Sequence, residues 1–135
     1  MRNLIRASLM IASFAAVQLT LNAQWGPPEG PWRPPRVHAL IDRVHEDLNR
    51  GYATWRLSGG DRGRLDHAEH ELREFAIHWE RGRFDKGNLD DSIGSIQHVI
   101  DNNHLSGRER DRLWEDVTQL RRMREAYDRH EIGRW

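Results

Sequence analysis

Proline is confined to one short segment of this chain, and that distribution limits what the remainder can form. All five prolines of the 135 residues lie between Gln24 and Arg36, so none follows Pro35. A proline inside a helix removes a backbone hydrogen bond and clashes with the preceding turn. Because the chain after Pro35 carries no such interruption, it is free to form long helices.

Apolar residues after Pro35 recur at helical spacing, which predicts a series of helices with one apolar face each. The first predicted helix starts at Pro35 and is ended by Gly59-Gly60. The second follows Asp61 and stops near Gly82. The apolar stripe of the first helix consists of Val37, Leu40, Ile41, Val44, Leu48, Tyr52 and Trp55, and that of the second consists of Leu65, Ala68, Leu72, Phe75, Ala76 and Trp79.

Two further helices are predicted in the C-terminal half. The third opens at Asn88 and ends at Asn102-Asn103. The fourth begins at a capping box, in which Ser106 and Glu109 each satisfy a backbone N–H group of the other, and it runs to about Ile132. Their stripes are Leu89, Ile93, Ile96 and Ile100 in the third and Leu113, Val117, Leu120 and Tyr127 in the fourth. No alternating strand pattern appears, so we expect an all-α fold, a small bundle of about four helices.

The N-terminus has the pattern of a secretory signal peptide. Arg2 and Arg6 form a positive start, Leu9–Leu21 is an apolar run, and Ala23 is the first small residue after it. The run of about 13 residues is shorter than the ~20 that span a bilayer, although an uncleaved membrane anchor is the alternative. We expect cleavage after Ala23, export to the periplasm or the extracellular space, and no transmembrane helix in the mature chain.

The expected organisation therefore has three parts. Residues 1–23 are the signal peptide, residues 24–36 are a proline-rich spacer, and residues 37–135 are the helical domain. Within the spacer, proline recurs every third residue from Pro28 to Pro34, which is the repeat of a polyproline II helix.

Composition excludes several classes of function. The chain has no cysteine, which excludes disulfides, thiolate metal sites and a cysteine nucleophile. Its 21 basic and 21 acidic residues balance, whereas a nucleic-acid-binding protein would carry a basic excess. No nucleophile elbow, phosphate-binding glycine loop or zinc-peptidase motif is present. We therefore expect a protein that is not an enzyme and uses no cofactor.

The densest group of candidate metal ligands lies on the second predicted helix. It consists of His67, His70, Glu71, Glu74 and His78. Helical spacing places these imidazoles and carboxylates along one polar side of the helix, and both are ligands for zinc, nickel or copper. A tight site would need a further donor, such as His38 or His104. The alternative is an ordinary polar face, stabilised by pairs three and four residues apart.

The six tryptophans suggest a binding role. Trp25, Trp32 and Trp135 lie outside the apolar stripes, and exposed aromatic residues are common anchors of protein interfaces. The sequence therefore predicts an exported helical domain that binds an unknown protein or envelope partner, including self-association. Metal capture or sensing by the second helix is the alternative.

Overall fold

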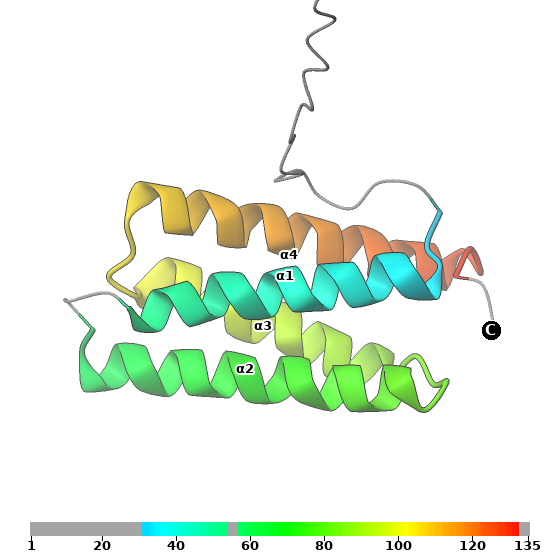
Figure 1. Ribbon diagram of the computed structural model, residues 1–135, viewed down its shortest axis with the longest axis horizontal. Coiled ribbons are helices and arrows are strands. Elements are labelled where there is room, and N and C mark those ends of the chain that lie inside the picture. Colours follow the sequence, from blue (N-terminus) through cyan, green and yellow to red (C-terminus); the bar gives the residue numbers. More distant parts are fainter. Residues whose placement is uncertain (1–30, 54–56, 133–135) are drawn as a thin grey trace, which may run out of the picture.

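The computed structural model describes residues 31–53 and 57–132, which form four helices (Figure 1). Helix α1 spans Pro34–Tyr52, α2 spans Gly59–Glu80, α3 spans Lys86–Asn102 and α4 spans Gly107–Asp128. The predicted all-α fold of about four helices is therefore confirmed. The expected signal peptide and the first residues of the spacer lie outside the described residues.

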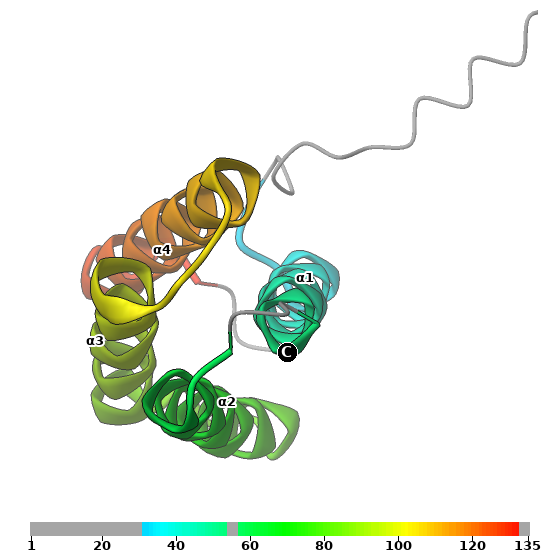
Figure 2. The same cartoon turned by 90° about the vertical axis from the view of Figure 1, so that its left-hand side faces the viewer.

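The helices follow one another around a ring, which Figure 2 shows nearly end-on. Each helix packs against its neighbours in sequence, and α1 also packs against α4 to close the ring. Short connections make successive helices antiparallel, as in an up-and-down bundle. None of these four helices combines the length and the hydropathy needed to cross a bilayer.

The core lies at the centre of this ring, and the predicted apolar stripes supply most of it. Trp79 and Phe75 of α2 are the largest fully buried side chains in the described part of the chain. Burial of each such side chain contributes roughly 1.5–3 kcal/mol before conformational entropy is counted. The other predicted stripe residues that are fully or almost fully buried are Val37, Leu40, Ile41, Val44, Leu48, Leu65, Ala68, Leu72, Leu89, Ile93, Ile96, Ile100, Leu113, Val117 and Leu120.

Gly59-Gly60 was expected to end the first helix, and that prediction is wrong. The first helix ends at Tyr52, and the two glycines instead open α2. The cause is Ser58, whose hydroxyl accepts the backbone N–H of Asp61 while the Asp61 carboxylate accepts the N–H of Ser58. This reciprocal capping box satisfies two N–H groups that lack helical partners, so it determines where the helix starts. Trp55 lies outside the described residues.

The starts of α1 and α3 also differ from the predicted ones, whereas α3 ends at Asn102 and α4 begins at the Ser106 capping box, as predicted. Helix α1 begins at Pro34, and Trp32, which lies outside the predicted stripes and was interpreted either as a contact point or as folding back onto the domain, is only 8% exposed and belongs to the core. The Arg36 guanidinium covers the Trp32 ring, 3.6 Å from its centroid. Helix α3 starts at Lys86, before the predicted Asn88, because the Asp85 side chain caps it.

The C-terminal end of α4 is shorter than expected. The helix stops at Asp128, and His130 adopts a left-handed backbone conformation with φ of 58°. Tyr127 does not continue the buried stripe, because its side chain is 38% exposed; Met123 and Ala126 are buried instead. Arg124, whose helical position predicts either an extended side chain or a carboxylate partner on another helix, pairs with Asp90 of α3.

Gly51 of α1 packs against the Leu65 side chain of α2. The position that its missing Cβ would occupy lies 3.0 Å from Cδ2 of Leu65, so a larger residue would require the Leu65 side chain to shift by a few tenths of an ångström. A glycine inside a helix costs about 1 kcal/mol relative to alanine, and here that cost permits tight packing.

Candidate functional site

The five predicted metal ligands do not gather into one cluster. His67 and Glu71 are neighbours, with 3.7 Å between Nδ1 and Oε1, and the His67 side chain is 63% exposed. His70 is also exposed, whereas Glu71, Glu74 and His78 are half-buried. Within residues 31–53 and 57–132, no three histidine, aspartate or glutamate side chains form an arrangement suited to a metal ion. Metal binding by this side of α2 stays a prediction.

His78 is held by the loop that joins α2 to α3. Its Nδ1 lies 2.7 Å from Oδ2 of Asp85 and 3.1 Å from Nδ2 of Asn88. The other carboxylate oxygen of Asp85 accepts the backbone N–H of Asn88 at 3.0 Å, which caps α3. That backbone bond, followed by the contact with His78, lowers the Asp85 pKa. His78 and Asp85 therefore stabilise the start of α3, and only Nε2 of His78 remains as a metal donor.

The expected additional donors also have other contacts. The ring of His38 meets Trp79 edge-on, with 6.3 Å between the centroids. Nδ1 of His104 lies 2.9 Å from Oδ2 of Asp61, at the opposite end of α2 from His78. Neither histidine is therefore placed beside the pair formed by His67 and Glu71.

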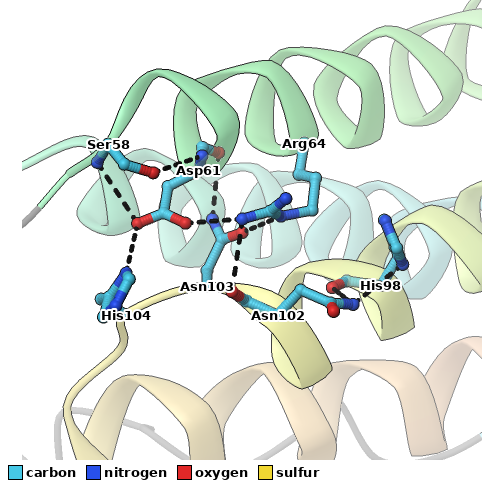
Figure 3. Close-up of polar contacts among 7 residues, drawn as sticks. All are labelled: Ser58, Asp61, Arg64, His98, Asn102, Asn103 and His104. Carbon is cyan, nitrogen blue, oxygen red and sulfur yellow. Dashed lines mark hydrogen bonds and ion pairs between the residues drawn. The ribbon is translucent and has the colours of Figure 1, made fainter.

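Asp61 is the centre of a polar network that joins the start of α2 to the end of α3 (Figure 3). Its side chain is 1% exposed, and it accepts hydrogen bonds from the backbone N–H of Ser58 at 3.3 Å and from Arg64 at 2.6 Å. Asn103 extends the network: its amide nitrogen donates to the backbone carbonyl of Asp61, while its oxygen accepts from Nε of Arg64 at 2.6 Å. Each donor in this network therefore bonds either to a residue of another element or to Asp61, which belongs to the cap of α2.

These donors stabilise the ionised form of Asp61. The hydrogen bond from His104 is the largest influence, and the Ser58 N–H and the Arg64 guanidinium add to it. Together they outweigh burial, which acts in the opposite direction, and the pKa of Asp61 falls far below its usual range. A carboxylate held in this way is a poor proton acceptor at neutral pH, so we assign Asp61 a structural role.

A second buried acidic group lies where α1 meets α4. Asp116 is completely buried and Asp47 is 5% exposed. Nε of Arg43 lies 3.1 Å from Oδ1 of Asp116, and another nitrogen of the same guanidinium donates to Glu115 at 2.7 Å. Asp47 contacts Arg50 at 2.5 Å. Arg112 of α4 also lies 3.7 Å from Asp47, so three carboxylates and three guanidiniums occupy one helix–helix contact, which we call the α1–α4 seam.

The seam raises the pKa of Asp116 to about 8. Burial is the main cause, followed by the negative charge of Asp47; Arg43 opposes both. In the ionised form neither oxygen of Asp116 has an aligned donor within the described residues, whereas the protonated form donates a hydrogen bond to Asp47. Asp116 is therefore protonated over most of the physiological pH range.

The contact between α1 and α2 holds a third buried acid. Glu69 is 6% exposed, and its Oε2 lies 2.5 Å from Nδ1 of His45 on α1. Burial raises the pKa of Glu69 above its usual range, and His45 acts against that rise. One turn away, the Tyr52 hydroxyl donates to Asp66 at 2.6 Å. Both pairs join the same two helices, which assigns them to packing.

Trp114 is the largest exposed apolar side chain among the described residues, at 41%. It projects from α4 into a segment of charged residues and belongs to no buried stripe. Tyr127, the other exposed aromatic, differs because its ring stacks on Phe84 with 4.1 Å between the centroids. Trp114 is therefore the described aromatic most available to a partner.

Sequence reasoning missed Trp114, the cap at Asp61 and the α1–α4 seam. The cap had a readable signal, because Ser58-Gly-Gly-Asp61 has the spacing of a capping box. Trp114 had one as well, as an aromatic residue on the charged side of its helix. The seam had none, because its partners are 72 residues apart in the case of Arg43 and Glu115.

Comparisons of the chain with protein-family models, with curated proteins and with solved structures found no match.

Proposed function

We propose that this chain is an exported, non-enzymatic helical domain that binds a protein or another component of the cell envelope. The exposure of Trp114 on α4 carries the proposal, since a tryptophan left 41% open to solvent is a favoured anchor of interfaces. The surrounding side chains of α4 are mostly charged, and an apolar anchor with a polar rim is the usual anatomy of a contact surface.

The placement of the buried acids supports the same class of function. Asp61 caps a helix, Asp116 is buried near Asp47, and Glu69 pairs with His45. Each of these groups contacts partners inside the bundle, so each has a structural role. The outer surface of α4 is therefore where we place function.

Export is tested separately. The signal pattern predicts that the protein accumulates outside the cytoplasm with Gln24 as its N-terminus. Intact-mass measurement of the accumulated protein decides this, and retention of residues 1–23 would refute cleavage.

Binding is tested by a photo-crosslinking amino acid placed at position 114 in producing cells. We expect a discrete cross-linked product at 114 and none at Asp91, an exposed position on α3 that serves as the matched control. Mass spectrometry of the product identifies the partner. Equal labelling at both positions, or none at 114, would contradict the proposal.

A further inference from the structure

The outer face of α4 carries an ordered pattern of charge around Trp114. Six exposed residues follow one another at intervals of three or four, so they lie along one side of the helix. In order they are Arg108, Asp111, Trp114, Thr118, Arg122 and Glu125. The charges therefore read basic, acidic, two uncharged residues, basic, acidic.

This pattern is complementary to its own reverse. Asp111 and Arg122 lie equally far from a point between Asp116 and Val117, on opposite sides of it, and the same holds for Arg108 and Glu125. A second α4 laid antiparallel across this point would therefore place each acidic residue opposite a basic one. Both copies use the same patch in such a two-fold arrangement, as in most soluble homodimers.

The same register brings the uncharged residues together. Trp114 of each copy would lie beside Thr118 of the other, with Arg121 one turn further along. Arg121 is exposed, and an arginine near a tryptophan face forms a favourable cation–π contact. The two tryptophans would thus be covered at the centre of the contact, with charged pairs on the outside.

The central charges are available for such pairing. Neither Asp111 nor Arg122 forms an ion pair within residues 31–53 and 57–132, although two arginines close to them in sequence do: Arg112 contacts Asp47, and Arg124 contacts Asp90. Glu125 has one long contact, 3.9 Å to Arg129. The six residues are exposed, whereas the buried stripe of α4, which includes Leu113, Val117 and Leu120, belongs to the core between this helix and its neighbours α1 and α3.

We propose that α4 is a homodimerisation surface, in which two copies pair antiparallel through Trp114 and through reciprocal contacts between Asp111 and Arg122. The inference rests on the proposed binding function and names its partner as a second copy of this chain. The exposed charged pairs fix the register of the two helices but add little to the affinity. The dimer is therefore weak and concentration-dependent.

The test is sedimentation equilibrium on the purified protein, in the form that cells accumulate, up to about 1 mM and at low salt, because affinities of this kind fall in the micromolar to millimolar range. We expect the wild type to dimerise. The substitutions Asp111→Arg and Arg122→Asp should each weaken the dimer at least about tenfold, because each places two like-charged pairs opposite one another. Trp114→Ala should weaken it as well.

Charge exchange gives the decisive comparison. The double variant Asp111→Arg/Arg122→Asp should regain wild-type association, and a mixture of the two single variants should form a heterodimer tighter than either alone. Asp91→Arg, a reversal on α3, should leave association unchanged. Circular dichroism of each variant checks that the fold is intact, which is expected because the altered residues are exposed.

Three results would overturn the dimer: a monomeric wild type at the highest concentration, single reversals without effect, or no rescue in the double variant. If the wild type is monomeric but position 114 still cross-links to another envelope component in cells, the dimer falls and the binding function stands. Cross-linking at position 114 only to a second copy of this chain, together with rescue by charge exchange, would show a dimer without a further partner.

Discussion

Asp61 and Asp116 are both buried aspartates, yet the protein treats them in opposite ways. Asp61, at the start of α2, accepts hydrogen bonds from three groups, and its pKa is lowered. Asp116, in the α1–α4 seam, lies near the carboxylate of Asp47, and its pKa is raised to about 8. Burial disfavours charge at both sites. The difference therefore comes from the neighbours: aligned N–H donors overcome the loss of solvation, whereas a second carboxylate adds to it.

The largest effect is expected at Asp61. Replacing it by Asn leaves one oxygen where three donors converge, and it places an amide N–H₂ group against some of them. We expect a loss of roughly 2–4 kcal/mol in the free energy of unfolding, typical of breaking a buried charged network. Urea unfolding followed by circular dichroism measures it. Asp91→Asn is the exposed control and should change stability by less than about 0.5 kcal/mol.

At Asp116 the same substitution should act in the opposite direction. An Asn at this position keeps a donor for Asp47 and requires no proton, so Asp116→Asn should stabilise the protein by roughly 1–3 kcal/mol at pH 7.5 and by little at pH 4. The reason is linkage: because the folded pKa exceeds the unfolded value near 3.9, wild-type stability falls as pH rises from about 4 to 8. Thermal unfolding at several pH values tests this. A destabilised Asn variant at pH 7.5 would contradict the raised pKa.

The dependence of stability on pH in the acid range should be set by Asp61. Its lowered pKa contributes stability that is present above about pH 4, the unfolded value, and is lost as pH falls further. His104 is the first contributor to that lowering, but its side chain is 64% exposed. We therefore expect His104→Ala to cost only about 0.5–1 kcal/mol at neutral pH and to reduce the acid dependence. If the stability of this variant no longer fell at all below about pH 4, Ser58 and Arg64 would contribute nothing to the lowered pKa of Asp61.

The smallest effect is expected where carboxylate and histidine are exposed to water. If the α2 side chains bind metal, affinity for zinc or copper should rise with pH through the histidine range near 6.5, because protons compete for the same nitrogen. At a metal concentration equal to the Kd the gain in stability is only about 0.4 kcal/mol. Isothermal titration at pH 7.5 measures binding directly. Binding weaker than about 100 µM, or unchanged by His67→Ala with His78→Ala, would end this hypothesis.

The sequence predicted the parts of the fold that depend on spacing along one helix. The residues at the centre of each stripe, such as Leu72 and Ile96, are buried as expected, and the cap at Ser106 is present. Helix boundaries were less reliable where glycine was interpreted as a stop, because Ser58 and Asp61 use the glycine pair inside a cap.

The sites that depend on contacts between distant segments were not predictable. His104 meets Asp61 across 43 residues, and nothing in the local pattern of either residue indicates the other. Asp116 sits beside the apolar stripe of α4, where a charged residue is ordinarily placed in solvent; only the position of α1 shows that it is buried. Arg124 is a partial exception, because a charge within an apolar stripe predicted either an extended side chain or a carboxylate partner on another helix, and Asp90 provides the partner.

The closing contact of the ring has a kinetic consequence. The contacts between α1 and α2, α2 and α3, and α3 and α4 each join neighbours in sequence, whereas the α1–α4 seam joins the two ends of the bundle. Closing so long a loop costs more chain entropy, so folding should form the local hairpins first and the seam last. In the folded protein the same seam should open most readily, which hydrogen exchange would detect as early exchange in α1. Because protonation of Asp116 favours the closed seam, acidification from pH 8 to 5 should slow that opening.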